Sequence, residues 1–281
     1  MMPISPSSCT VQNPTVQHRT LFIRASDDHE VECRTTEPGR ADAVVVMQLG
    51  TLSRANYFDL MATELAQRFS AVSYAIPSRR RGAKSYKQHA DDLDQVVRLA
   101  KTENPGLPIV VAGVSLGADI ANEWRTRLDH GHTPVVAMSP VVMTKLSYLS
   151  PKQLVKVMAG FLSETLAKRT VDSPLSAGIP LTTNPASYEW NQRDQDAKVP
   201  VSLFDDNLRM VSAATIRCRR GSAPVVVMLA GADQVANSAV TRMWAKVFRN
   251  QKTLSIPGAA HDLSQETNHP LVVDTLGGLL F

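Results

Sequence analysis

The feature that most constrains this chain is an apolar run, Ile109–Ala112, that passes directly into Gly113–Gly117 (Gly-Val-Ser-Leu-Gly) and then into a helical pattern. A short apolar run rich in branched residues is typical of a fully buried strand. Ile120 and Trp124 follow at helical spacing. A strand that turns sharply into a helix through two glycines is typical of a nucleophile elbow. This turn would expose the Ser115 hydroxyl to a base and to an electrophile together.

The two glycines of this turn are expected to be required by its geometry. A side chain at Gly113 or Gly117 would crowd the turn, and Ser115 is expected to lie in a strained region of backbone conformation. The alternative interpretation is an ordinary turn serine that caps a helix, because a five-residue pattern of small residues also arises by chance.

A nucleophilic serine needs a histidine to take its proton, and a carboxylate to hold the imidazole in the right tautomer. A carboxylate is available after a second buried-strand pattern, Pro224–Ala230, which ends in Gly231 and then Asp233. We therefore predict that Asp233 orients the histidine. The alternative role for this residue is a helix N-cap, which aspartate also favours.

The histidine that fits best is His261, which follows a further strand pattern at 253–256 and a Pro-Gly-Ala-Ala loop at 257–260. The chain has seven histidines, and a structural loop histidine is the alternative. Taken together, Ser115, Asp233 and His261 are predicted to form a catalytic triad.

Several segments resemble the α/β-hydrolase superfamily and, within it, the monoacylglycerol lipase and lysophospholipase-like group. The order serine, aspartate, histidine is the order of that superfamily. The resemblance covers roughly residues 40 to 280 and is carried by Leu49-Gly50, Asn56–Ala66, Gly113–Gly117, Gly231–Asp233 and His261–Glu266. It implies an α/β fold with a mostly parallel central sheet flanked by helices, a helical cap insertion, and hydrolysis of carboxylic esters.

Two departures from the family pattern bear on the oxyanion hole. Leu49 stands where the family usually has a histidine before the glycine. The glycine-rich segment that usually follows the next strand is matched only in part, by residues 78–85. Acyl transfer builds negative charge on the carbonyl oxygen, which two backbone N–H groups normally receive. We assign these donors to Leu116 and Thr51. An ordinary loop after the strand is the alternative for Thr51.

Buried-strand patterns alternate with amphipathic helical patterns, which predicts parallel strands joined by crossover helices. The segments 19–24 and 31–35 are expected to form a leading hairpin. Two helical faces are marked by Leu60, Met61, Leu65 and Phe69, and by Leu93, Val96, Val97 and Ala100.

A chain of 281 residues can bury a single large core. We expect a poorly ordered tail at residues 1–15, a hydrolase core at 16–142 and 208–281, and a cap at 143–207. Start signals for a helix at Ser150 and Pro151 precede an apolar stripe. The stripe is interpreted either as ordinary core packing or as a substrate-binding surface, and it consists of Leu154, Met158, Phe161 and Leu162.

Charge and cysteine content exclude several function classes. The net charge is +4, but the basic clusters are short and lack interleaved aromatics, so we expect no nucleic-acid partner. Weak association with anionic membrane surfaces is compatible with this charge. Three scattered cysteines form no metal or redox motif, and no metal or cofactor is expected. No signal peptide or apolar span is recognised, which predicts a cytoplasmic protein. The oligomeric state is left open.

The predicted function is hydrolysis of a carboxylic ester, with a small acyl ester as partner. Three alternatives remain. An acyltransferase or thioesterase would use the same triad. A small-residue aminopeptidase would need an acidic site in the cap, for which Glu189, Asp194 and Asp196 are available. A binding protein on the same fold would show little turnover.

Overall fold

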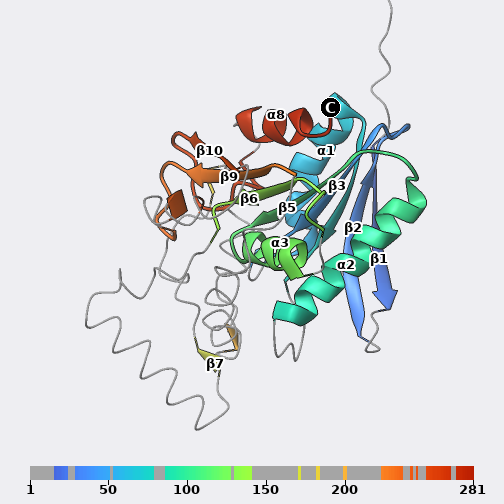
Figure 1. Cartoon of the computed structure of the whole chain (residues 1–281), viewed down its shortest axis with the longest axis horizontal. Coiled ribbons are helices and arrows are strands. Elements are labelled where there is room, and N and C mark those ends of the chain that lie inside the picture. Colours follow the sequence, from blue (N-terminus) through green and yellow to red (C-terminus); the bar gives the residue numbers. More distant parts are fainter. Residues whose placement is uncertain are drawn as a thin grey trace, which may run out of the picture.

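The computed structural model describes residues 16–24, 29–50, 53–78, 86–127, 130–140, 170–171, 182–183, 199–200, 223–236, 241–242, 245, 251–266 and 270–281. Its main element is an eight-stranded sheet with strand order β1-β2-β4-β3-β5-β6-β9-β10 (Figure 1). The strands are β1 (Gln17–Arg24), β2 (Glu30–Glu37), β3 (Ala43–Gln48), β4 (Ala71–Ile76), β5 (Ile109–Val114), β6 (Val135–Met138), β9 (Val225–Ala230) and β10 (Gln251–Ile256).

The sheet is mostly parallel, and β2 is the one strand of the eight that runs against the others. β1 and β2 form the expected antiparallel hairpin, and β2 pairs antiparallel with β4. The remaining pairs, from β4–β3 through β9–β10, are all parallel. The predicted fold class, a mostly parallel sheet flanked by helices, is confirmed. The sequence patterns had not singled out β4.

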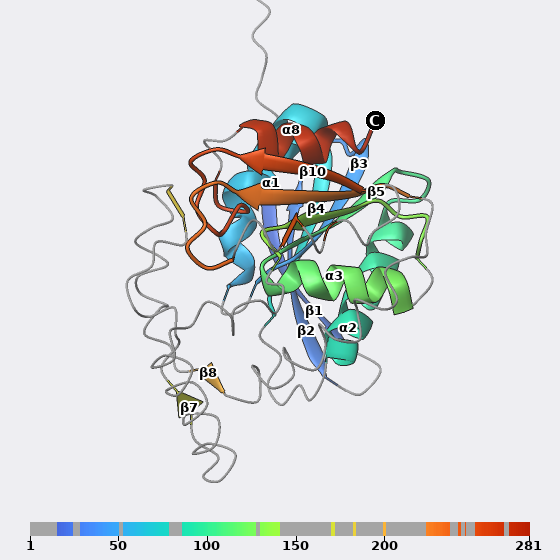
Figure 2. The same cartoon turned by 60° about the vertical axis from the view of Figure 1, so that its left-hand side comes forward.

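Helices cover both faces of the sheet (Figures 1 and 2). They are η1 (Ala55–Phe58), α1 (Asp59–Phe69), α2 (Tyr86–Glu103), α3 (Leu116–Arg127) and α8 (Pro270–Gly278). Alternate residues of β3 enter two separate cores: Val45 and Met47 lie in the cluster that includes α1 and α8, while Val44 and Val46 lie in the cluster that includes α2 and α3. Each such buried side chain contributes about 1.5–3 kcal/mol relative to exposure.

The structure buries one of the two predicted helical faces completely and the other only in part. All four residues predicted for the 93–100 face are buried in α2. On α1 the prediction is wrong for Leu60, which is 38% exposed. The buried stripe of α1 is instead formed by Met61, Ala62, Leu65 and Ala66. Two of these four buried residues are alanines, which the pattern of large apolar residues did not include.

Few residues of the stretch predicted as a cap, 143–207, are among those that the structure describes. β7 (Thr170–Val171) and β8 (Val199–Pro200) pair antiparallel as a separate two-stranded sheet. Figures 1 and 2 both draw β7 apart from the large sheet. Most of 143–207, including the predicted helix after Ser150, and the tail at 1–15 lie outside the described residues. Among the helices in the described ranges, none has the length and apolarity needed to cross a lipid bilayer.

Candidate active site

Ser115 lies at the turn between β5 and α3, in the left-handed backbone region with φ +55°. Its own N–H donates to the carbonyl oxygen of Met138 at 2.9 Å, and its carbonyl accepts from the N–H of Ala118 at 3.1 Å. A non-glycine residue held in this region costs about 1–3 kcal/mol, which the surrounding structure must offset. The strain predicted for Ser115 is therefore present.

Both glycines are required, as predicted, but only Gly113 is required by crowding within the turn, since a side chain at Gly117 would meet the end of β3. A Cβ atom added to Gly113 would lie 2.2 Å from the carbonyl oxygen of Gly117, and one added to Gly117 would lie 2.0 Å from that of Gln48. Both contacts are with backbone, so neither can be relieved by moving a side chain. The turn is thus closed to any residue larger than glycine at these two positions.

The side chains of Ser115, Asp233 and His261 meet at one edge of the sheet. The Nε2 atom of His261 lies 2.8 Å from the Oγ atom of Ser115, and its Nδ1 atom lies 2.9 Å from Oδ2 and 3.0 Å from Oδ1 of Asp233. The side chains of His261 and Asp233 are only 4% and 3% exposed. The three residues follow β5, β9 and β10, whose parallel carboxyl ends lie at the same edge.

The Asp233 carboxylate is held by more than the imidazole. Its Oδ1 atom accepts from the backbone N–H of Val235 at 2.7 Å and of Ala236 at 2.8 Å. Burial raises the pKa of this carboxyl, but the hydrogen bond and charge of His261 and these two N–H donors outweigh it, so the pKa lies below its usual value. The histidine and the two backbone N–H groups thus share the Asp233 carboxylate, and no helix among the described residues begins directly after it.

One of the two predicted oxyanion donors can be located. Leu116 is the first residue of α3, so its N–H lies at the positive end of the helix dipole, directly after the serine. Thr51 lies outside the described residues. Its neighbour Gly50 is described, and a Cβ there would lie 3.0 Å from Cβ and 3.6 Å from Oγ of Ser115. The chain after β3 thus passes next to the serine.

Two polar residues that the sequence analysis did not select hold this passage in place. The Ser78 hydroxyl donates to the carbonyl oxygen of Leu49, and the Gln48 amide donates to Ser78 Oγ at 2.9 Å. Leu49, which replaces the usual family histidine, is fully buried in the core beside α1. Ser78 belongs to the segment that departs from the family pattern, and that departure is the only signal the sequence offers for it.

The turn after His261 is a second feature that the motif alone did not explain. The Asp262 carboxylate accepts from the backbone N–H and hydroxyl of Ser264 and from the side-chain amide of Gln265. Burial raises the pKa of Asp262, and these donors and the charge of His261 offset only part of that effect. This carboxylate closes the turn that carries the imidazole.

Leu154, Met158, Phe161 and Leu162 lie outside the described residues, as do the three acidic residues considered for an amine site. Within the ranges that are described, no group of three or more His, Cys, Asp and Glu side chains could hold a metal ion.

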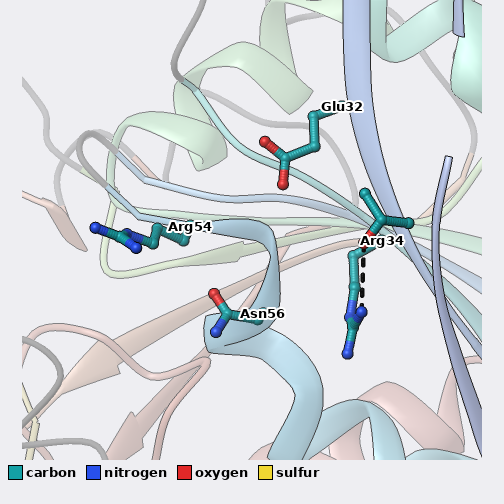
Figure 3. Close-up of a pocket in the computed structure, with 5 residues that line it drawn as sticks. Glu32, Arg34, Arg54 and Asn56 are labelled. Carbon is teal, nitrogen blue, oxygen red and sulfur yellow. Dashed lines mark hydrogen bonds between the residues drawn. The ribbon is translucent and has the colours of Figure 1, made fainter. Parts of the chain in front are cut away.

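A polar hollow of about 410 Å³ opens beside the β1–β2 hairpin and η1 (Figure 3). Arg34 is fixed there by the Asp59 carboxylate, at 2.8 Å from Nη2 to Oδ2. The hollow contains neither the serine nor the histidine, and its lining residues are Thr20, Glu32, Arg34, Arg54 and Asn56.

Comparison with known proteins finds one family and several related structures. The family described as serine aminopeptidase, S33, matches residues 40–268. A monoacylglycerol lipase of Mycolicibacterium smegmatis is 23% identical over 244 residues, which are 82% of this chain and 85% of that protein.

Two solved structures match along nearly their full length. A soluble variant of monoglyceride lipase from Saccharomyces cerevisiae, in complex with a substrate analog, is 16% identical with a TM-score of 0.70, and the match covers 98% of this chain and 99% of that one. The monoacylglycerol lipase of Paleococcus ferrophilus is 18% identical with a TM-score of 0.67, covering 89% and 100%. At these identities the likeness bears on the fold alone.

Proposed function

The chain is an α/β-hydrolase of the monoacylglycerol lipase-like group and belongs to the serine aminopeptidase, S33, family, and on that premise we propose that it hydrolyses carboxylic esters through a serine acyl-enzyme. One observation carries the proposal: the hydrogen-bonded series from Ser115 through His261 to Asp233. The arrangement supplies a nucleophile, a base and a group that orients the base, which are the parts that acyl transfer requires.

We propose a role for each atom of this series. An ionised Asp233 only accepts hydrogen bonds, so Nδ1 of His261 carries the proton and Nε2 is left as an acceptor. Nε2 takes the hydroxyl proton of Ser115 as Oγ attacks the carbonyl carbon of the ester. The oxyanion is received by the N–H groups of Leu116 and Thr51.

The tetrahedral intermediate then collapses, and the alcohol leaves with the proton that Nε2 had taken. An ester between the acyl group and Ser115 Oγ remains. Water attacks this acyl-enzyme while Nε2 of His261 takes one of its protons. The carboxylic acid leaves, and the proton returns to Oγ, so the enzyme is restored.

We place the substrate in the monoacylglycerol or lysophospholipid class. This choice is supported by the relatives that are named monoacylglycerol lipases. We further propose that residues 143–207 form a cap over the core defined by 16–142 and 208–281, and that the apolar stripe Leu154, Met158, Phe161 and Leu162 contacts the acyl chain. Apolar methionine and phenylalanine side chains suit a flexible hydrocarbon.

A fluorophosphonate probe, which reacts only with an activated serine, tests the nucleophile. The parent protein should be labelled and Ser115→Ala should not. Ser139 provides a matched control, because it follows β6 as Ser115 follows β5 and also has a positive φ, +44°. Its hydroxyl has no hydrogen-bond partner among the described residues, so Ser139→Ala should be labelled like the parent. Labelling that persists in Ser115→Ala would place the nucleophile elsewhere.

The substrate class is tested with monoacylglycerols and simple esters of increasing acyl length. A rise in kcat/KM toward medium or long chains supports the lipid proposal, and a preference for acetyl esters contradicts it. Products made with a second alcohol or thiol present would reveal an acyltransferase. A protein that the probe does not label would be a binding protein with little turnover.

The family description favours one second candidate, an aminopeptidase. Such an enzyme needs a site for a protonated amine, and Glu189, Asp194 and Asp196 are the proposed acidic residues. Aminoacyl anilides with a free amine, compared with the same compounds acetylated on nitrogen, separate the two functions. Cleavage of the free-amine compounds alone would identify the aminopeptidase.

A further inference from the structure

Among the described residues, Thr183 of the inserted stretch and Glu266 of the segment that carries the imidazole are joined by hydrogen bonds. The Oε1 atom of Glu266 accepts from the backbone N–H of Thr183 at 2.5 Å, and its Oε2 atom accepts from the Thr183 hydroxyl. The two residues are 83 positions apart. Glu266 is five residues beyond His261, whereas Thr183 lies in the middle of the stretch predicted as the cap. We call this pair the Thr183–Glu266 clasp.

The buried position of Glu266 makes the clasp energetically important. The residue is 0% exposed, while Thr183 is exposed. A carboxylate removed from water is costly unless donors replace its hydration, and hydrogen bonds to a charged group are stronger than those between neutral groups. Loss of a donor from Thr183 would therefore favour movement of Glu266 toward other donors or toward solvent.

Movement of Glu266 cannot be absorbed locally, because the turn back to His261 is closed by its own hydrogen bonds. The N–H of Leu263 donates to the His261 carbonyl at 3.1 Å, that of Gln265 to the Asp262 carbonyl at 3.1 Å, and that of Glu266 to the Leu263 carbonyl at 3.4 Å. Every residue from His261 to Glu266 is buried. The turn is therefore a compact unit with the imidazole at one end and the clasp at the other.

We propose that Glu266 is a positioning residue, which through the Thr183–Glu266 clasp and the closed turn holds the imidazole of His261 at the distance from Ser115 that proton transfer requires. The inference rests on the proposed function. It makes the reactivity of the serine depend on a hydrogen bond to the inserted stretch, far from the reacting atoms. Misplacement of a catalytic group by about 1 Å can cost on the order of 100-fold in rate.

The test uses the rate constant for labelling of the full-length chain by a small fluorophosphonate, which reports how well the base activates the serine. Thr183→Val removes the hydroxyl donor without touching the core and should slow labelling about tenfold. Thr183→Ser keeps the donor and should restore most of the rate. Thr102→Val is the control, because that exposed threonine also loses a hydroxyl bond, to the Arg98 carbonyl on α2.

A second variant, with each labelling rate normalised to the folded fraction, distinguishes a positioning role of Glu266 from a role in folding. Glu266→Met removes both acceptors and should slow labelling at least as much as Thr183→Val. The double variant Thr183→Val with Glu266→Met should be labelled no more slowly than Glu266→Met alone, because Glu266→Met already removes the acceptor of the Thr183 hydroxyl. Circular dichroism and thermal unfolding give the folded fraction, to which each rate is normalised.

The outcomes separate this inference from the function on which it depends. Equal normalised rates for the parent and Thr183→Val would overturn the clasp as a positioning device while leaving the serine mechanism intact. A rate loss that disappears on normalisation would show a merely structural role and overturn it as well. Absence of labelling in the parent would overturn the proposed function, and this inference with it.

Discussion

The Nε2 atom of His261 lies 2.8 Å from the Oγ atom of Ser115, although 146 positions separate the two residues in the chain. The strands that precede them, β10 and β5, are three strand spacings apart in the sheet, which is about 14 Å. The loop after β10 therefore carries the imidazole back across β9. Two backbone hydrogen bonds, both 2.8 Å, hold this loop beside the end of β9. The N–H of Gly231 donates to the Ile256 carbonyl, and the N–H of Ala232 donates to the Ala259 carbonyl.

The first prediction concerns the orientation of His261. Asp233→Asn should lower kcat for a simple ester by about 10³–10⁴-fold, because an amide that donates to Nδ1 favours the tautomer whose Nε2 carries the proton. Such an imidazole cannot accept the proton of Ser115. Asp42→Asn, which alters an exposed carboxylate beside Arg40, should leave kcat unchanged. Steady-state kinetics of the two variants test this prediction. Normal turnover by Asp233→Asn would exclude Asp233 from the proposed triad.

The second prediction follows from the lowered pKa of Asp233. Because this pKa is lower in the folded than in the unfolded protein, ionised Asp233 stabilises the fold above the unfolded pKa, and the contribution is lost as pH falls through the folded pKa. Below about pH 4, the free energy of unfolding should therefore fall more steeply for the parent than for Asp233→Asn. Urea unfolding at several pH values measures the slopes. Parallel curves would contradict the lowered pKa.

The third prediction tests the closed turn around Ser115. Gly117→Ala should destabilise the protein by about 3 kcal/mol or more, because its Cβ would overlap the Gln48 carbonyl, which is backbone. Gly278→Ala is the matched control at the end of α8, where no atom beyond its chain neighbours and its own helix backbone lies within 4 Å of the added Cβ. It should be neutral or stabilising by up to about 1 kcal/mol. Urea unfolding compares the two, and equal stabilities would refute the steric argument.

The fourth prediction compares two buried serines, one within β4 and one just after it. Ser78→Ala removes the donor that holds the Leu49 carbonyl and should cost about 1–2 kcal/mol of stability. It should also lower kcat, because the chain beside Gly50 is less well held. Ser73 lies within β4, and its hydroxyl has no partner among the described residues. Ser73→Ala should therefore be neutral or stabilising. Similar effects of the two changes on kcat would remove the proposed role of Ser78.

Local features were predictable because they depend on residues close together in the chain. The apolar strand pattern before Ser115, the positive φ of Ser115 and the need for Gly113 depend on residues in or beside one short turn. The need for Gly117 does not, because a Cβ there would meet the Gln48 carbonyl at the end of β3. The parallel sheet followed from alternating apolar strand patterns and amphipathic helices. The error at Leu60 shows the limit of such patterns, because only contact with the sheet decides which edge of a helical stripe is covered.

Relations between distant segments required the tertiary structure. The sequence by itself determined which residue types were available for a nucleophile, a base and an acid, because those depend on chemistry and chain order. It did not indicate that Ser78 holds the Leu49 carbonyl or that Glu266 binds Thr183. Those partners are 29 and 83 positions apart. Hydrogen bonds act only over about 3 Å, so the packing of the whole sheet and its loops decided which polar groups meet.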